Sequence, residues 1–153
     1  MFYTDLERGK KGERYVCALM ERRNHEVKDV SLDFEAGFDF WIDDNKVELK
    51  TDYVINHSDN LFLEDYIEYS KGGCAKGWFN TCKAQYLFYL DEKSLTLYIY
   101  LLDELRDYVK ENRGVIPYRS LDDGYKRVYG YCLNKDLVRN QVIRNSEVCW
   151  YGI

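Results

Sequence analysis

The sequence predicts one α/β domain that spans residues 1–153, with a mixed central sheet flanked by helices. Its length of 153 residues suits a single hydrophobic core. One proline and a hydrophobic fraction of 46% are typical of a compact globule and exclude a disordered or linker-rich chain. Helix-like and strand-like segments also alternate along the chain, without an internal repeat or a linker between them.

The N-terminal segment is expected to be a helix. In residues 5–23, Leu6, Val16 and Leu19 recur at roughly helical spacing among charged positions, and Asn24 supplies a plausible end. A polar loop at 56–60 and the sequence Lys71-Gly72-Gly73 interrupt the strand-like segments. We expect strands at 26–33, 38–43, 46–52, 61–69, 85–90, 95–101, 129–133 and 148–151, and helical segments at 75–83, 102–112 and 135–139.

The charge of the chain is unevenly distributed. The net charge is −5, which speaks against a general nucleic-acid binder. Residues 31–70 carry eleven acidic and two basic side chains, and a concentration of carboxylates is what a metal site requires. Residues 106–144 carry nine basic and five acidic side chains, which suits contact with a phosphate backbone. Uneven solvated surface charge explains the basic part equally well.

The five cysteines and two histidines indicate neither a zinc module nor a disulfide scaffold. The cysteine count is odd, no C-x-x-C pair occurs, and the histidines are far apart in the sequence. Reduced thiols of this kind are typical of the cytoplasm. The N-terminus lacks an apolar signal region, and no run of about 18 apolar residues occurs, so we expect a cytoplasmic protein without a membrane partner.

The segment 38–50 forms the most informative pattern in the chain. It is expected to be a hairpin with a two-residue turn at Asp44-Asn45. Because alternate residues and cross-strand partners share a face, Asp39, Glu48 and Lys50 project to one side and the apolar residues to the core. The expected cross-strand pairs are Asp43 with Lys46, Trp41 with Glu48, and Asp39 with Lys50.

Two carboxylates and an ammonium group on one face predict a metal-dependent reaction at phosphate. Neighbouring carboxylates repel each other, and a divalent cation such as Mg²⁺ relieves that repulsion by binding their oxygens. The lysine then stabilises charge on a phosphate. A solvated ladder of salt bridges on an exposed sheet edge is the structural alternative. The turn residues Asp43 and Asp44 are expected to shape the turn and not to bind metal.

The pattern Phe38-Asp39, eight residues, then Glu48-Leu49-Lys50 resembles the motif of the PD-(D/E)XK nuclease superfamily, which includes restriction endonucleases and Holliday junction resolvases. Glu13 on the preceding helix resembles the extra glutamate of the resolvase-like branch. The resemblance covers roughly residues 10–90, and residues beyond 100 resemble no family. It implies a restriction-endonuclease-like fold, a metal-dependent endonuclease acting on duplex or branched DNA, and Mg²⁺ or Mn²⁺ as cofactor.

The same resemblance assigns roles to individual residues. It implies Asp39, Glu48 and the Leu49 carbonyl as metal ligands, Lys50 as the catalytic lysine, and Glu13 as a further catalytic residue that supports the site. Members of this size often act as dimers, so a homodimer is expected. Segments 60–64, 77–78 and 84–87 also resemble small phage- and bacterial-type endonucleases. Weaker candidates are Glu64 as a further ligand, and Lys76, Thr81 and Lys83 as residues facing the substrate.

The sequence departs from the superfamily pattern at two positions. Phe38 stands where the motif has proline, and Gln85 stands where a later strand of the small endonucleases has aspartate. Three further hypotheses remain open. One is a catalytically silent nuclease-fold protein that binds nucleic acid or assembles with a partner, although the intact set of two acids and a lysine speaks against it. Another is a structural or protein-interaction module, which the negative net charge favours. The third keeps the chemistry but changes the substrate to RNA.

Overall fold

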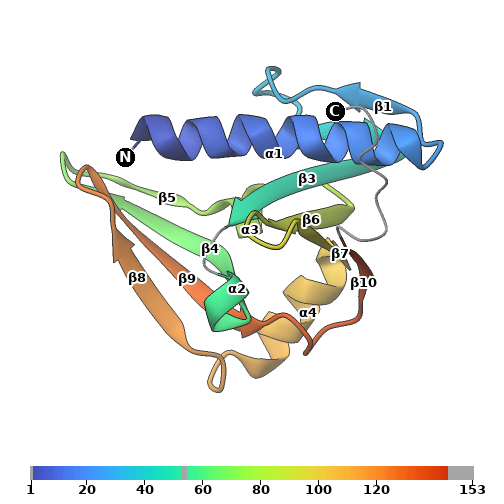
Figure 1. Cartoon of the computed structure of the whole chain (residues 1–153). Coiled ribbons are helices and arrows are strands. Elements are labelled where there is room, and N and C mark those ends of the chain that lie inside the picture. Colours follow the sequence, from blue (N-terminus) through green and yellow to red (C-terminus); the bar gives the residue numbers. More distant parts are fainter. Residues whose placement is uncertain (1, 53–54, 145–153) are drawn as a thin grey trace.

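A computed structural model describes residues 2–52 and 55–144 of the chain (Figure 1). The long first helix and a second helix of eleven residues frame the strands, and two further helices have four residues each. In chain order the elements are α1 (Phe2–Arg22), β1 (Val27–Asp29), β2 (Phe40–Ile42), β3 (Asn45–Asp52), α2 (Ile55–Ser58), β4 (Asn60–Tyr69), β5 (Cys74–Lys76), α3 (Trp78–Thr81), β6 (Tyr86–Asp91), β7 (Thr96–Leu101), α4 (Leu102–Asn112), β8 (Tyr118–Asp122), β9 (Lys126–Asn134) and β10 (Asn140–Ile143).

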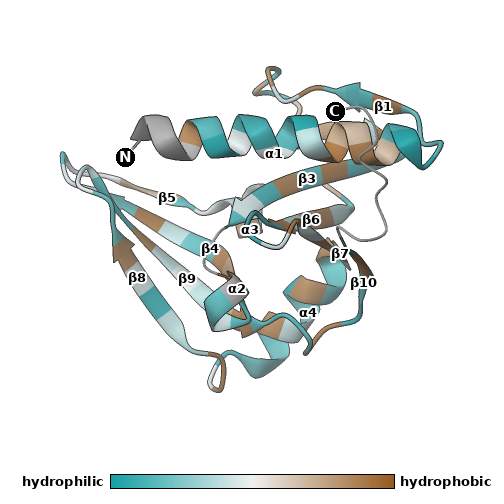
Figure 2. Cartoon of the chain, in the orientation of Figure 1, coloured by the Kyte–Doolittle hydropathy of each residue, from teal (hydrophilic) through white to brown (hydrophobic). Residues whose placement is uncertain are grey.

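The central sheet has six strands in the order β1-β2-β3-β6-β7-β10, and it confirms the expected mixed α/β architecture. Strands β3 and β6 are parallel, whereas the other neighbours are antiparallel. Helix α1 crosses one face of this sheet, and its C-terminal half is the apolar half (Figures 1 and 2). There Val16, Leu19 and Met20 pack against Phe40, Val47 and further apolar side chains of the sheet. Burial of these side chains anchors the helix to the strands that carry the candidate site.

A second sheet of four antiparallel strands, in the order β5-β4-β9-β8, was not expected. It packs through Leu61, Leu63 and Leu133 against α4 and the other face of the central sheet. Strand β8 has no buried residue, so it lacks the alternation of apolar and polar residues that identifies a strand in a sequence. Figure 1 shows the two sheets splayed apart beneath α1, with α4 between them.

Several local expectations are confirmed. The helix at 102–112 and the strands at 85–90 and 95–101 correspond to α4, β6 and β7. Asn24, at a positive φ of 67°, follows the end of α1, as an αL residue at a helix C-terminus does. The strand expected at 61–69 corresponds to β4, and the one at 129–133 lies within the longer β9.

Other local expectations are wrong. The strand expected at 26–33 is limited to β1, and the polar loop at 56–60 begins with the short helix α2. The helix expected at 75–83 is replaced by β5 and α3, because a turn with positive φ at Gly72 and Gly73 returns the chain alongside β4. Residues 135–139 form turns, and β10 was not expected. The strand expected at 148–151 lies outside the described residues.

The register of the β2–β3 hairpin also differs from the expectation. Ile42 pairs with Asn45, so Asp43 and Asp44 form the turn. Asp43 adopts a positive φ of 52°, which suits a two-residue hairpin turn. The pairing is therefore displaced by two residues, and Trp41 faces Lys46 instead of Glu48. Because side chains alternate with a period of two, this displacement leaves the facing of every residue unchanged.

Within the described ranges 2–52 and 55–144, no helix is long and apolar enough to cross a membrane.

Candidate active site

Asp39 lies immediately before the first residue of β2. The antiparallel neighbour β3 is longer than β2 and extends past it at this point. The backbone N–H of Asp39 donates to the carbonyl of Val47 at 3.0 Å, and Val47 is also the residue that pairs with Phe40 in the sheet. The side-chain Oδ2 of Asp39 accepts a hydrogen bond from the Leu49 N–H at 2.9 Å. The Asp39 carboxylate therefore binds the backbone of β3 at Leu49, where β2 no longer covers it. The expected register had instead placed Asp39 opposite Lys50.

Glu48 and Lys50 project from β3 on the side opposite to the apolar residues Val47 and Leu49. Glu48 is only 9% exposed, and its Oε1 lies 2.8 Å from the Lys50 ammonium. The same ammonium lies 4.9 Å from the centroid of the Trp78 ring. The two charged side chains therefore form a largely buried ion pair that Trp78 covers on one side. Asp39, Glu48 and Lys50 are brought together, as the alternation of residues predicts.

The carboxyl of Asp39 is held in an unfavourable electrostatic environment. Burial first, and then the charge of the nearby Glu48, raise the pKa of Asp39 from its ordinary value to about 7. The hydrogen bond from Leu49 and the charge of Lys50 oppose this rise in pKa only in part. A carboxyl so perturbed is typical of sites where a cation or a reacting group supplies the missing charge.

Lys50 remains a cation. Burial lowers the pKa of its ammonium, but Glu48 raises it by charge and by a hydrogen bond, with Asp39 adding to the effect, and the resulting pKa is above its ordinary value. A lysine that keeps its proton at neutral pH cannot act as a general base. It can instead donate hydrogen bonds and positive charge to an anion in the site.

Glu13 lies on α1 and is near enough to Asp29, Glu48 and Asp39 for their charges to affect one another. Burial raises the pKa of Glu13, and the neighbouring Asp29 and Glu48 add to that rise. The adjacent Gly12 allows this close approach, because a Cβ at that position would overlap the Thr51 side chain on β3. Glu13 therefore belongs to an acidic group, which also contains Asp29, Asp39 and Glu48.

Asp29, at the end of β1, is a member of this acidic group that the sequence analysis missed. It is the strongest charged influence on the pKa of Glu13. Asp29 pairs with Phe40 in the sheet, and its Oδ1 accepts hydrogen bonds from both the N–H and the hydroxyl of Ser31. The signal that could have found it is an acidic residue at the end of a strand that neighbours the Asp39 strand.

Glu64 lies on β4, on the side of Lys50, and its charge contributes to the raised pKa of that lysine. Two features bring it there. A β-bulge between Glu64 and Tyr66 re-aims this part of β4. Gly77 packs directly on the Glu64 backbone, where any Cβ would overlap the carbonyl oxygen. Glu64 is thus the weaker candidate that lies nearest to the expected site.

The residues present suit a hard divalent cation, although their side chains do not form a complete set of metal ligands. Within the described parts of the chain, no group of three or more His, Cys, Asp or Glu side chains is arranged to hold a metal ion. Asp39 and Glu48 nevertheless offer oxygen ligands. The carbonyl of Lys46 points towards β6, and that of Val47 points towards β2. Because backbone groups alternate in direction along a strand, the Leu49 carbonyl points to the same side as that of Val47, beside Asp39.

The other weak candidates lie on β5 and in and after α3. Lys76 is exposed and pairs with Tyr66 on β4. The Thr81 hydroxyl donates to the Gly77 carbonyl at 3.3 Å, and the Lys83 N–H donates to the Gly37 carbonyl at 3.0 Å. These two residues hold the α3 region in place. Arg106 has a similar role, because its guanidinium binds the carbonyls of Phe79 and Cys82 at 2.8 and 2.7 Å.

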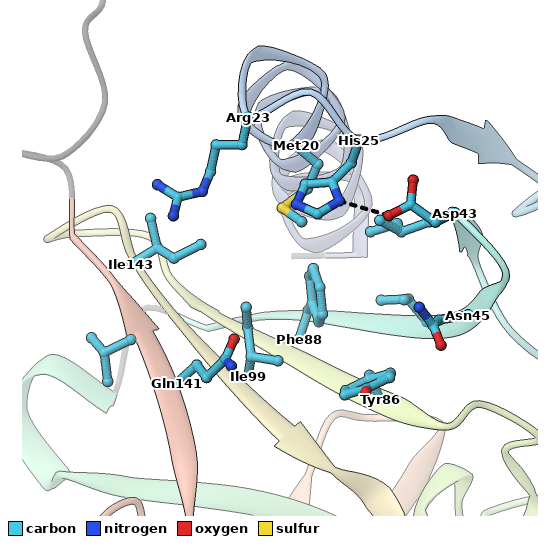
Figure 3. Close-up of a pocket in the computed structure, with 13 residues that line it drawn as sticks. Met20, Arg23, His25, Asp43, Asn45, Tyr86, Phe88, Ile99, Gln141 and Ile143 are labelled. Atoms are coloured by element: carbon cyan, nitrogen blue, oxygen red, sulfur yellow. Dashed lines mark hydrogen bonds and ion pairs between the residues drawn. The ribbon is translucent and has the colours of Figure 1, made fainter.

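Two hollows flank the central sheet at opposite ends of β3. The first, of about 660 Å³, begins at Lys50 and Asp52 and extends to the second sheet. The second, of about 600 Å³, lies between the end of α1 and the start of β3 (Figure 3). Its polar feature is the pair His25–Asp43, at 2.7 Å from Nδ1 to Oδ2. None of the acidic group around Asp39 lines this second hollow.

Comparison with known proteins adds no relative: no family model, no curated protein and no solved structure matches the chain. The assignment of a function therefore rests on the arrangement of its own residues.

Proposed function

We propose that the chain is a metal-dependent endonuclease that hydrolyses DNA phosphodiester bonds. The observation that carries the proposal is the position of Asp39, buried beside Glu48 with a pKa raised to about 7, while Lys50 stays protonated 2.8 Å from Glu48. Two acids and one cation at an open strand edge suit a divalent cation and a phosphate together. The same positions are those that resemble the PD-(D/E)XK motif.

In this proposal the residues have distinct roles. Asp39, Glu48 and the Leu49 carbonyl would hold Mg²⁺ or Mn²⁺, and the bound cation would supply Lewis-acid activation of water and charge neutralisation at the phosphate. Lys50 turns from Glu48 to donate a hydrogen bond to a phosphate oxygen as charge develops there. Glu13 orients water at the open edge of the sheet. The water oxygen forms a bond to phosphorus and its proton passes to solvent, while one ester P–O bond breaks and the leaving oxygen takes a proton from solvent.

The second hypothesis is a nuclease-fold protein without turnover that binds nucleic acid or another protein. The Glu48–Lys50 ion pair favours it in one respect, because it already satisfies both charges without a metal. The raised pKa of Asp39 favours the enzyme, since the ion pair does not relieve the burial of that second carboxyl. DNA is proposed over RNA on the family resemblance alone.

A cleavage assay tests the proposal. Plasmid, branched and single-stranded DNA are incubated with the protein in Mg²⁺, Mn²⁺ or EDTA, beside Asp39→Ala and Lys50→Ala. Asp43→Ala is a matched control, because it removes an aspartate of the same hairpin that is exposed and bound to His25. We expect cleavage by the wild type and the control in either metal, and none by the other two variants or in EDTA.

The assay separates the two hypotheses. Cleavage that persists in EDTA, or in both Asp39→Ala and Lys50→Ala, contradicts the proposed site. Absence of cleavage on every substrate, together with no Mn²⁺ binding by calorimetry, supports the hypothesis of a silent nuclease fold. A single-stranded RNA of the same sequence, assayed in parallel, decides between DNA and RNA.

A further inference from the structure

Apart from Lys50, the residues that line the hollow of about 660 Å³ have no role in the proposed chemistry. The hollow opens between the C-terminal end of β3 and the second sheet, and β3 points towards β4 (Figure 1). Its two walls therefore come from distant parts of the sequence. One wall carries Lys50 and Trp78, and the other carries Arg119 and Leu121 of β8.

The hollow is continuous with the candidate active site. Lys50 belongs to both, because its ammonium contacts Glu48 on one side and the Trp78 ring on the other. From Glu48 to Asp52, which also lines the hollow, β3 advances about 13 Å at the usual rise of a strand. A phosphate held by Lys50 thus has its neighbouring nucleotide beside this hollow.

The lining suits a flat, apolar ring that carries a negatively charged group. Trp78 and Phe62 provide aromatic surface, and Leu121 stays 57% exposed where it faces the hollow. Lys50 and Arg119 provide positive charge on opposite walls. Aromatic rings stack on nucleic-acid bases without regard to sequence, and cationic side chains follow the phosphates of a single strand.

The floor of the hollow is rigid. The Tyr89 hydroxyl donates to Asp52 Oδ2 at 2.7 Å and accepts from the Phe62 N–H at 3.1 Å. It therefore ties β6 to both β3 and β4. A hollow held in this way is preformed, which lowers the conformational entropy that the protein loses when a ligand binds.

We propose that this hollow receives one unpaired nucleotide next to the phosphate that is cleaved, so that the substrate is DNA with an unpaired or displaced nucleotide. The inference rests on the proposed function and names its substrate class. A hollow of this size suits a ligand of nucleotide size. A volume of about 660 Å³ has room for one nucleotide and not for a stretch of double helix. An unpaired base also enters at little cost, because it is not withdrawn from a base pair.

The test uses two DNA duplexes of the same sequence, one perfect and one with a single unpaired 2-aminopurine. Binding is measured by anisotropy in EDTA, and cleavage is measured separately in Mg²⁺. We expect about tenfold tighter binding of the bulged duplex, a change in 2-aminopurine emission, and a kcat/KM for the bulged duplex about tenfold higher. A duplex with an abasic bulge is expected to lose most of this preference, since it has no base to stack.

Two tryptophan substitutions form a matched pair. Leu121→Trp fills the hollow from β8, whereas Leu137→Trp adds the same ring at a leucine of similar exposure, 54%, that does not line it. We expect Leu121→Trp to bring the ratio of bulged to perfect duplex, in binding and in kcat/KM, down to about one. Leu137→Trp is expected to keep the wild-type ratio. Thermal melts check that both variants are folded.

The outcomes separate the inference from the proposed function. Cleavage without any preference for the bulged duplex overturns the inference and leaves the nuclease activity standing. A preference that Leu121→Trp does not reduce also overturns it. Preferential binding of the bulged duplex in EDTA, lost in Leu121→Trp, supports the assigned ligand even if no DNA is cleaved in Mg²⁺, and that combination overturns hydrolysis instead.

Discussion

Two aspartates flank the three-residue strand β2, and their environments are opposite. Asp43, after the strand, is exposed, accepts a hydrogen bond from the Glu26 N–H at 3.0 Å and pairs with His25. These hydrogen bonds, that of His25 first, lower the pKa of Asp43. Asp39, before the strand, is largely buried beside Glu48, and its pKa is raised to about 7.

The difference shows that ionisation is stabilised by the fold at one aspartate and opposed by it at the other. Asp43 has partners that stabilise its charge, so its ionisation supports the native state. Asp39 has a second acid as its neighbour, so its ionisation opposes the native state until a cation arrives. The sequence alone does not distinguish the two aspartates, whereas their surroundings shift their pKa values in opposite directions.

The largest expected effect is on activity. Glu48→Gln removes a charge needed for the metal and frees Lys50 from its ion pair, so we expect kcat for DNA cleavage in Mg²⁺ to fall about 10³-fold. Asp43→Asn, at the other end of β2, is expected to change kcat less than about twofold. Single-turnover cleavage of a labelled duplex measures both. Equal losses in the two variants would contradict the distinction between the two ends.

The next effect is on stability, at the wall that faces Lys50. Gly77→Ala puts a Cβ into the Glu64 backbone, so we expect the free energy of unfolding to fall by about 3 kcal/mol. Gly114→Ala is the control, because a Cβ there meets no atom within 4 Å. Urea denaturation followed by circular dichroism measures both variants. A loss for Gly77→Ala no larger than for Gly114→Ala would show that the contact with Glu64 is not tight.

A smaller effect, of opposite sign, is expected at Asp39. Between pH 3.8 and about 7 the unfolded chain releases the Asp39 proton while the folded chain keeps it, so this residue lowers stability as pH rises. Without metal, Asp39→Asn should therefore have a Tm about 3–6 °C higher than the wild type at pH 8. At pH 4 the two proteins should have the same Tm. Melts at both pH values in EDTA measure this. Saturating Mn²⁺ should raise the wild-type Tm only. A variant that melts lower at pH 8 would contradict the raised pKa.

The smallest effect is expected at Asp43, with the reverse dependence on pH. Its folded pKa lies below 3.8, so its contribution to stability is present above that pH and is lost as the pH falls through the folded pKa. Because the side chain is exposed, Asp43→Asn should lower Tm by about 2 °C or less at pH 7, and by less still at pH 3. Differential scanning calorimetry at both values measures the change. A larger loss at pH 3 than at pH 7 would reverse the assignment.

The facing of the candidate residues was predictable, but their pairing was not. Alternation along β3 depends only on local geometry, so Asp39, Glu48 and Lys50 were expected on one side and are found there. The register of the β2–β3 pair depends on which two residues form the hairpin turn. Asp43 turns because His25 and the Glu26 N–H bind its side chain, and these partners lie 18 and 17 residues away. No local pattern contains that information.

The second sheet was missed for a similar reason. Strand β9 was expected in part, but its pairing with β4 joins Asn60 to Asn134, which no periodicity reveals. Strand β8 is exposed along its whole length, so burial leaves no pattern in its sequence. As a result the sequence predicted the acidic group but not the wall formed by Arg119 and Leu121. Asp29 was missed because β1 is short and its acid is placed by the sheet, not by a motif.

The pairing of β4 with β9 has a consequence for how the protein is made. Ribosomes release the N-terminal part first, so the hairpin with Asp39 and Glu48 emerges long before β9. Pairing from Asn60 to Asn134 requires a long loop to close, which is slow compared with the folding of a hairpin. A nascent chain that ends before residue 134 therefore has the acidic hairpin without its second wall. Under the proposed function, the hollow that selects the substrate would therefore form after the proposed metal ligands are in place.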